Sequence, residues 1–293
     1  MMKTKKKFIV LAAIVAILIL LIIWIAYGNT DLEIYKYNVK SEDIPSEFDN
    51  FRIVQISDLH NTEFGENNEK LLLMLKQADA DIIAITGDMI DSRNTDIDVA
   101  ISFAQKAVNI APVYYVNGNH ESRVLGEYEK LKQGLTDAGV TILENSSADI
   151  TIGDEAITLI GINDPTFCME FVDDTMEQNI AHQLVNVIPD NDNYKVLLAH
   201  RPEYFDVYAG NVDLVLSGHA HGGQFRIPFI GGLVAPGQGF FPEYYEGSHI
   251  KENTEMIVSR GIGNSIIPFR INNKPEIIVA ELTKIAELGE VDI

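Results

Sequence analysis

The sequence predicts a single α/β domain that follows one N-terminal transmembrane helix. Beyond residue 50, short apolar runs rich in β-branched residues alternate with segments of helical period, which is typical of layered α/β folds. The first thirty residues contain a long uncharged apolar run. A chain of 293 residues allows one large domain or two small ones, but no internal repeat, low-complexity tract or linker follows residue 50, which favours one domain.

The apolar run extends from residue 8 to residue 27 and is long enough to cross a bilayer. Twenty residues at about 1.5 Å each span the ~30 Å hydrocarbon core. Trp24 and Tyr27 stand at its far end, where aromatic rings favour the lipid–water interface. Four lysines lie among the first seven residues, so we expect the N-terminus to be cytoplasmic and the chain from Asp31 onward to be extracytoplasmic, in a single-pass protein of the cell membrane.

A cleaved signal peptide is the alternative for this segment, since Ala26 and Gly28 provide small residues. The apolar part of a signal peptide is usually only ~7–15 residues long, which favours a retained anchor. We therefore divide the chain into a basic tail with anchor (1–28), a tether with one strand at 32–39 (29–50), the folded domain (51–285) and a C-terminal tail (286–293).

Strands and helices can be assigned in order along the domain. Residues 51–57 and 81–86 are apolar and β-branched, as buried strands require. Leu71, Leu75 and Ala78 share one helical face within 66–78. Further strands are expected at 112–116, 157–162, 194–199, 212–217 and 276–282, and further helices at 96–110, 127–138 and 172–187, the helix at 127–138 ending at Gly139.

Charge and cysteine content exclude several functions. The formal net charge is −21, and no basic cluster occurs outside the N-terminus, so nucleic-acid binding is not expected. The single cysteine, Cys168, excludes an internal disulfide and a Cys-rich zinc site, and we interpret it as a packed or loop thiol.

Five of the seven histidines fall in turns that directly follow predicted strands. Ligands gather at the carboxyl ends of strands in open α/β sheets, because the loops there converge on one crevice. The residues concerned are Asp58 and His60, Asp88 and Asp91, Asn119 with His120 and Glu121, His200, and His219 with His221. Any one of these histidines alone could be a structural residue, but the joint pattern predicts a site. His182 and His249 lack this context and are interpreted as structural or surface residues.

Seven of these side chains carry the nitrogen or oxygen lone pairs that metals bind: Asp58, His60, Asp88, Asn119, His200, His219 and His221. One ion would leave several of them unused, whereas two ions sharing a carboxylate would use them all. Mixed imidazole, carboxylate and amide ligation suits Mn, Fe or Zn better than Mg or Ca. Neighbouring glycines such as Gly118 and Gly218 would allow tight turns and close backbone approach.

The order of these blocks over residues 50–282 resembles the calcineurin-like metallophosphoesterases. The last block, residues 218–224, together with the N-terminal apolar segment, is similar to the membrane-linked YkuE- and YaeI-like branch of bacterial phosphodiesterases. Asn61 departs from the small residue often found after His60. The resemblance implies a four-layer αββα sandwich with two mixed β-sheets and a dimetal site at one edge. It assigns Asp58, His60 and His221 to one ion, Asn119, His200 and His219 to the second, and Asp88 to both.

The implied activity is hydrolysis of phosphate esters, favouring diesters, by attack of a metal-bridging hydroxide. His120 would approach the leaving-group oxygen, while Asp91 and Glu121 would orient these groups. The resemblance points to lipid-linked or nucleotide-diphosphate substrates. An inactive metal-binding scaffold is one alternative, and the complete ligand set disfavours it. A different class of two-metal hydrolase is another, and it is disfavoured because the His-x-His pair, His219 and His221, comes last among the motif blocks. Whether Arg201 contacts phosphate or forms a surface ion pair stays open. The aromatic residues Phe240, Phe241, Tyr244 and Tyr245 could pack, line a substrate groove or face the bilayer.

Overall fold

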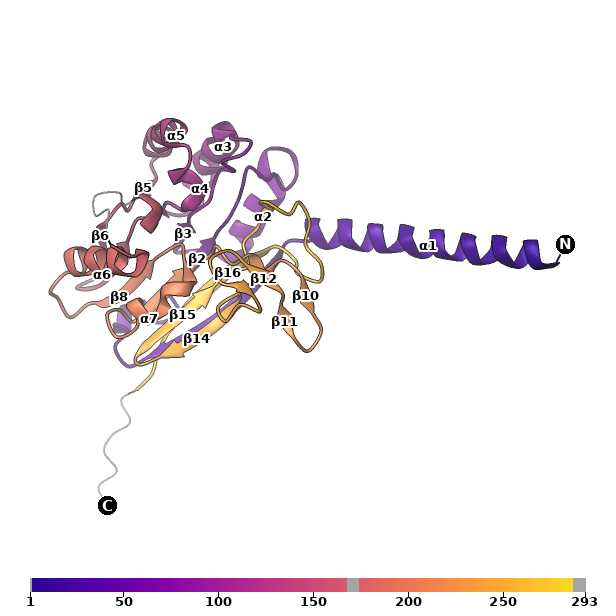
Figure 1. The fold of residues 1–293 in the computed structure, drawn as a ribbon. Helices are drawn as coiled ribbons and strands as arrows, with labels where there is room; N and C mark the ends of the chain where they lie inside the picture. The colour runs from indigo at the N-terminus through magenta and orange to yellow at the C-terminus, as the bar shows by residue number, and fades with distance from the viewer. Residues whose placement is uncertain (1, 168–173, 287–293) are drawn as a thin grey trace, which may run out of the picture.

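The structure is a computed structural model that describes residues 2–167 and 174–286. Helix α1 (Met2–Thr30) projects away from a layered domain (Figure 1). The segment at residues 5–30 of this helix is long and apolar enough to cross a membrane, and its most apolar stretch of 18 residues is not buried in the domain. The predicted span at 8–27 lies inside it. Cys168, and residues 172 and 173 of a predicted helix, lie outside the described residues.

The first sheet combines strands from both ends of the domain in the order β1-β16-β2-β3-β4-β5. Strands β2 to β5 run parallel, whereas β16 is antiparallel to β2 and parallel to β1, so the sheet is mixed. The strands are β1 (Glu33–Ser41), β2 (Arg52–Ile56), β3 (Ile82–Thr86), β4 (Val113–Val116), β5 (Thr141–Ile142) and β16 (Glu276–Lys284). Helices α2 (Glu69–Ala78), α3 (Ile97–Ala107) and α5 (Leu125–Ala138) cover its outer face.

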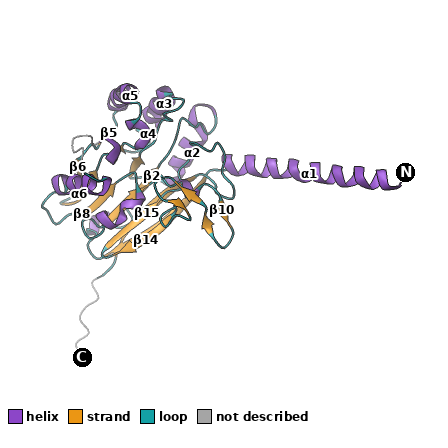
Figure 2. Cartoon of the chain, in the orientation of Figure 1, coloured by secondary structure: helices purple, strands orange, loops and turns teal. Residues whose placement is uncertain are grey.

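The second sheet has the order β14-β15-β9-β8-β7-β6, with antiparallel strands at both edges. Its strands are β6 (Ser146–Ile152), β7 (Glu155–Gly161), β8 (Tyr194–Leu198), β9 (Leu214–Ser217), β14 (Gly247–Lys251) and β15 (Thr254–Val258). Helices α6 (Met176–Val187) and α7 (Phe205–Tyr208) cover its outer face, and Figure 2 shows the strands lying between the helical layers.

Alternating side chains hold the four layers together. Ile53 enters the core between the sheets, whereas its neighbour Val54 packs under the helices of the first layer. In β8, Val196 points between the sheets and Leu197 points toward α6 and α7. Successive side chains of a strand point to opposite faces, so strands buried on both faces must be apolar throughout. The expected αββα sandwich with two mixed sheets is confirmed.

Short elements fill the connections. They are α4 (Asn119–Ser122), the strands β10 (Arg226–Ile227), β11 (Gly231–Gly232), β12 (Val234–Ala235) and β13 (Gly239–Phe240), and the 3-10 turns Ser46–Phe48, Glu66–Asn68, Pro165–Phe167, Pro202–Tyr204 and His221–Gly223. Helix α5 ends as predicted, with Gly139 in the left-handed conformation at φ 93°. Helix α6 begins at Met176, and Thr175 at its N-cap forms a capping box with Gln178 in its first turn.

The segment at 29–50 differs from a free tether. Strand β1 pairs with β16 over its whole length, and Phe48 is fully buried against Phe51 in the core between the sheets. The expected strand at 32–39 is therefore the edge strand of the first sheet. The boundaries drawn at residues 51 and 285 stay a prediction.

Candidate metal centre

All seven predicted donors lie where strands of the two sheets end. Asp58 and His60 follow β2, Asp88 follows β3 and Asn119 follows β4 in the first sheet, while His200 follows β8 and both His219 and His221 follow β9 in the second. None of these residues is more than 5% exposed. Because the carboxyl ends of the parallel strands meet at one edge, residues far apart in the sequence converge there.

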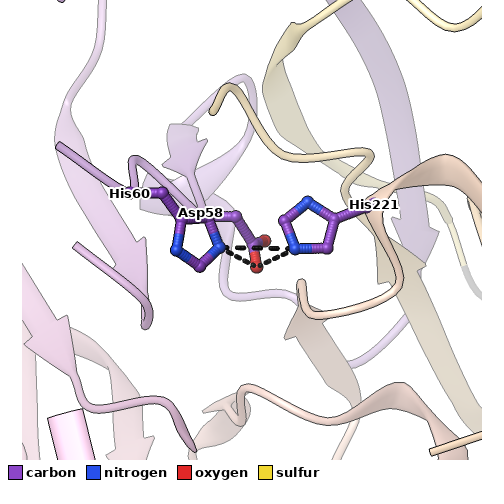
Figure 3. Close-up of side chains that lie close together, drawn as sticks. All are labelled: Asp58, His60 and His221. Atoms are coloured by element: carbon purple, nitrogen blue, oxygen red, sulfur yellow. Dashed lines mark hydrogen bonds and ion pairs between the residues drawn. The ribbon is translucent and has the colours of Figure 1, made fainter. Parts of the chain in front are cut away.

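The first group of donors consists of Asp58, His60 and His221 (Figure 3). The Nε2 atoms of the two histidines are 3.3 Å apart, and the Oδ1 atom of Asp58 lies 3.8 Å from His60 Nε2 and 3.6 Å from His221 Nε2. Two imidazole nitrogens held this close beside a buried carboxylate need a proton or a cation between them. The three side chains therefore fit a metal ion.

The second group consists of Asp88, His200 and His219. His200 Nε2 lies 3.3 Å from Asp88 Oδ2 and 3.2 Å from His219 Nδ1. On the other side of the ring, His200 Nδ1 is 2.7 Å from the carbonyl oxygen of Thr86. A carbonyl only accepts, so Nδ1 carries a proton. In the neutral ring Nε2 offers its lone pair to the group, which is the usual arrangement of a metal-binding histidine. Burial lowers the pKa of His200, but the charge of Asp88 outweighs it and raises the pKa to about 10, so a cation bound at Nε2 would have to displace a proton.

Asp88 lies between the two groups. Its Oδ2 atom is 3.6 Å from His60 Nε2 in the first group and 3.3 Å from His200 Nε2 in the second. Its other oxygen, Oδ1, accepts the backbone N–H of His120 at 2.9 Å. The Asp88 carboxylate is thus within reach of imidazoles that follow strands of both sheets. The hydrogen bond from the His120 N–H fixes its orientation.

Asn119 completes the donor set from a different direction. Its side-chain oxygen Oδ1 is buried without a hydrogen-bond partner among the described residues. Asn119 lines a cavity of about 260 Å³ together with Asp88, His120, His219 and His221. A buried amide oxygen without a donor is costly unless a cation or water satisfies it, so this atom also fits a metal site.

The backbone is strained at the turns that carry the donors. Asp58, His60, Asp88, His219 and His221 all have positive φ angles, between 46° and 64°. Non-glycine residues seldom adopt this conformation, and such residues cluster at functional sites where the surroundings hold them. Here the His60 N–H donates to the carbonyl of Asp88 at 3.0 Å, and the His219 N–H donates to the Asp58 carboxylate at 3.1 Å.

Two glycines allow this close approach. A Cβ atom at Gly218 would collide with the Ser57 hydroxyl and come 2.5 Å from Asp58 Oδ2. A Cβ atom at Gly118 would collide with the carboxylate of Asp88 and come 2.7 Å from its backbone nitrogen. The expectation of close backbone approach at these glycines is thereby supported by the geometry.

Burial and mutual interaction set the charges in the site. Burial alone would raise the pKa of Asp88, but His200 and His60 hold the pKa well below its usual value. Burial lowers the pKa of His221 to about 3 and the pKa of His219 well below its usual value. The carboxylate is thus ionised and these two imidazoles are neutral, which is the form in which both bind metals.

Glu121 and Asp91 support these side chains from behind. The Glu121 carboxylate accepts the backbone N–H of Asp88 at 3.1 Å and of Gly118 at 2.9 Å, joining the turns after β3 and β4. Burial and then the charge of Asp88 raise the pKa of Glu121 to about 7. Asp91 pairs with Arg93 at 2.7 Å and lies 3.7 Å from His120 Nδ1.

His120 lies at the edge of the cavity with a defined tautomer. Its Nδ1 atom accepts the backbone N–H of Ser92 at 3.0 Å, so the neutral ring carries its proton on Nε2. Nε2 lies 3.1 Å from the Ser265 hydroxyl. Burial lowers the pKa of His120 to about 4. With His60 and Asp91 it forms a third group whose donor atoms lie within 4.8 Å of one another.

Several residues around the cavity were not expected from the sequence. Arg201 forms a buried ion pair, with its Nε 2.7 Å from Asp164 Oδ2, and its Nη1 lies 3.3 Å from His219 Nε2 while it lines the cavity. Arg201 therefore forms an ion pair, but this pair is buried and not the surface ion pair given as an alternative, and Asp164 gave no signal in the sequence. The rim contains the apolar residues Val234, Pro236, Ile266 and Ile267.

The two histidines without strand-end context lie outside the three donor groups. His182 lies on α6, with an exposed side chain 3.6 Å from Asp174. His249 lies on β14, and its Nε2 is 3.0 Å from the carbonyl oxygen of Glu246. Both positions agree with the structural or surface role expected for them.

Comparison with known proteins assigns the family. The calcineurin-like phosphoesterase family model matches residues 51–223. The metallophosphoesterase YkuE of Bacillus subtilis is 30% identical to this chain, and the alignment covers 86% of this chain and 85% of YkuE. The phosphodiesterase YaeI of Escherichia coli is 27% identical, over 79% of this chain and 82% of YaeI. A transmembrane protein with a metallophosphoesterase domain from Danio rerio is 27% identical, over 80% of this chain and 54% of that protein. The chain belongs to the calcineurin-like phosphoesterases and is a phosphoester hydrolase.

The close contact at Gly218 predicts the effect of a single methyl group. In Gly218→Ala the new Cβ displaces Asp58, so we expect the affinity for added Mn²⁺ or Zn²⁺ to fall at least ~10-fold, as when the support of a metal ligand is lost. Metal titration of the purified protein measures this. Gly126→Ala is the control, because a Cβ at Gly126 meets no atom within 4 Å. Unchanged metal affinity in Gly218→Ala would show that Asp58 is not a ligand.

Proposed function

We propose that this chain is a membrane-anchored, dimetal-dependent phosphodiesterase whose two ions share Asp88. The position of Asp88 between the two donor groups carries the proposal, because one oxygen lies within 3.6 Å of an imidazole in each group. In this assignment Asp58, His60 and His221 bind one ion, and Asn119, His200 and His219 bind the other. The mixed nitrogen and oxygen donors favour Mn, Fe or Zn over Mg.

When bound by these donors, two ions would supply an activated water at neutral pH and would offset the negative charge that develops on phosphate in the transition state. The chain itself positions the donors. Glu121 holds the turns of Asp88 and Gly118 through their backbone N–H groups, and Asp91 lies behind His120. Loss of either carboxylate would leave the donors in place but less well oriented.

His120 acts on the leaving group in this proposal. The Ser92 N–H occupies Nδ1, so the Nε2 proton is available to a group bound in the cavity. A hydrogen bond donated by Nε2 stabilises the negative charge on the departing oxygen, which then takes its proton from water. Ser265, at 3.1 Å from Nε2, orients the same face of the ring.

A diester with an apolar substituent fits the cavity. Four of the seven donors line it together with apolar side chains: the donors are Asp88, Asn119, His219 and His221, and the apolar residues are Val234, Pro236, Ile266 and Ile267. A phosphate bound at the donors would place one substituent against this apolar rim, which supports a lipid-linked substrate over a nucleotide diphosphate. The name of the relative YaeI, a phosphodiesterase, supports diesters over monoesters.

We further propose that α1 is retained as a single membrane span with the domain on the extracytoplasmic side. The exposed apolar surface of α1 supports insertion in lipid, and the four lysines before it support a cytoplasmic N-terminus.

Substitution of the shared carboxylate tests the dimetal assignment. In Asp88→Ala, we expect hydrolysis of bis(p-nitrophenyl) phosphate to fall at least ~10³-fold, because both ions lose a ligand and the charge stabilisation that depends on them. The metal-stripped protein should regain activity with Mn, Fe or Zn in the wild type but not in the variant. Asp190→Ala removes an exposed carboxylate and serves as the control. Full activity in Asp88→Ala would exclude the shared carboxylate, and hydrolysis of p-nitrophenyl phosphate at a higher rate than the diester would exclude the diester preference.

Substitution of His120 separates proton donation from metal binding. In His120→Ala we expect kcat to fall ~10²–10⁴-fold while the bound metal per chain is unchanged. The loss should be larger for phenyl than for p-nitrophenyl esters, because the more basic phenolate depends more on a hydrogen-bond donor. His182→Ala provides the control. An equal loss for both esters would assign His120 to support of His60 instead of the leaving group.

Protease treatment of intact cells tests the orientation. We expect an external protease to degrade the domain while the N-terminal tail stays protected, because the lysines retain the tail in the cytoplasm. Epitope tags at the two ends, detected by immunoblotting, distinguish the fragments. Complete protection of the domain in intact cells, with cleavage after lysis, would reverse the proposed orientation.

A further inference from the structure

A second cavity, of about 420 Å³, lies where α1 meets the domain. Trp24, Tyr27 and Gly28 of α1 line one side, and the basic residues Arg226, Arg260, Arg270 and Lys274 line the other. We propose that this cavity binds the phosphate of an anionic phospholipid headgroup. It shares no lining residue with the cavity at the metal centre, so it is a separate site.

The basic lining is unusual for this chain. The protein has a net charge of −21, yet four of its 22 lysines and arginines line this one cavity, with Glu33 as the single acidic residue of the lining. Basic side chains in a cavity at the membrane surface attract anionic headgroups. Arginine is especially suited to phosphate because its planar guanidinium donates two parallel hydrogen bonds.

Carboxylates pair with three of these four cations. Arg226 pairs with Glu246, Arg260 with Glu276 and more distantly with Glu33 and Glu246, and Lys274 with Asp31 and Glu33. Arg270 is 1% exposed and has no carboxylate within 4 Å among the described residues. Its guanidinium donates instead to the carbonyls of Arg260 and Gly263 and to Asn264, which share its hydrogen bonds but do not cancel its charge.

Unused donors also remain at this cavity. The Nε atoms of Arg226 and Arg260 are buried without a hydrogen-bond acceptor among the described residues. A buried guanidinium nitrogen without an acceptor is costly, because it has lost water without gaining a partner. The phosphodiester of a phospholipid headgroup has two charged non-bridging oxygens able to accept from such donors.

The end of α1 is attached rigidly beside the cavity. The Asn29 side chain donates to the carbonyl oxygen of Arg270 at 2.9 Å and accepts the Arg270 N–H at 2.7 Å. Lys70 also donates to the carbonyl oxygen of Thr30 at 2.7 Å. Because Trp24 and Tyr27 are residues that favour the lipid–water interface, these contacts hold the cavity at headgroup depth.

The surface around this cavity also fits a position at the level of the lipid headgroups. Figure 1 shows β10, β11 and β12 on the side of the domain from which α1 projects. The turns and strands here expose Phe229 completely and leave Ile230, Phe240 and Phe241 more than half exposed. Exposed apolar residues grouped beside a membrane helix can enter the interface, so the acyl chains of a lipid bound in the cavity would continue along α1 into the bilayer.

The full-length chain in detergent is the protein for the test, and Trp24 is its single tryptophan. Short-chain phosphatidylglycerol, phosphatidylcholine or inorganic phosphate is titrated while the Trp24 emission is followed, and native mass spectrometry counts the lipids retained. We expect one phosphatidylglycerol to bind per chain with a saturable change in emission. Phosphatidylcholine and inorganic phosphate should bind at least ~10-fold more weakly, because one lacks net charge and the other lacks the acyl chains that contact α1.

Two double variants are compared that remove the same charge from different places on the protein. Arg226→Gln with Lys274→Gln removes two cavity cations, and we expect phosphatidylglycerol affinity to fall at least ~10-fold. Arg52→Gln with Lys251→Gln is the matched control, because it removes one arginine and one lysine of similar exposure from surface ion pairs elsewhere. Lys274→Gln alone, at a half-buried position, should weaken binding by a smaller factor if the double variant unfolds.

Three outcomes would overturn the proposal. Equal affinity for phosphatidylglycerol in the cavity variants and the control would show that bulk charge, not the cavity, attracts the lipid. Equal affinity for phosphatidylcholine would remove the role of the cations. Saturation by inorganic phosphate at the same concentration would assign the site to a soluble anion. All three readouts measure binding, so they are independent of whether the metal centre is active.

Discussion

The metal centre depends on one constraint, the placement of a buried carboxylate where the carboxyl ends of both sheets meet. Asp88 belongs to the first sheet, yet His200 of the second sheet is its nearest imidazole, at 3.3 Å. That contact requires the two sheets to pack with their strand ends in register, which the apolar core between them provides. The backbone strain at the donor turns, the absence of side chains at Gly118 and Gly218, and the hydrogen bonds of Glu121 all serve the same placement.

The site is also a concentration of buried polar atoms that the fold alone does not satisfy. His60 Nδ1 and Asn119 Oδ1 lack hydrogen-bond partners among the described residues, and ionised Asp58 and Asp88 are fully desolvated. Two divalent cations would neutralise these carboxylates and satisfy the lone pair of Asn119 Oδ1. Their binding energy would therefore contribute to folding as well as to catalysis, because the unfolded chain has no preformed site.

The sequence was sufficient for the residues at strand ends but not for those that support them. A buried parallel strand followed by Asp, His or Gly-Asn-His is a local pattern, so the donors and the layered fold could be predicted. Asp164, Ser265 and Arg270 lie in irregular segments, and their contacts with Arg201, His120 and His221 depend on tertiary packing. Strand β1 resembled a tether because an exposed edge strand has few buried residues; among its nine residues only Val39 is fully buried.

The contacts around Arg270 connect the anchor to the catalytic edge of the sandwich. Asn29, at the end of α1, bonds to the backbone of Arg270, whose Nη2 lies 3.5 Å from His221 Nδ1. Asn273, in the same segment, donates to the carbonyl oxygen of His221 at 2.7 Å. A flexible tether would let the domain rotate freely above the bilayer, whereas this short series of contacts, part-buried at Asn29 and buried at His221, opposes rotation. The depth and orientation of the metal centre relative to the lipid surface are therefore consequences of how α1 ends, and a substrate held in the membrane would meet the site in a fixed direction.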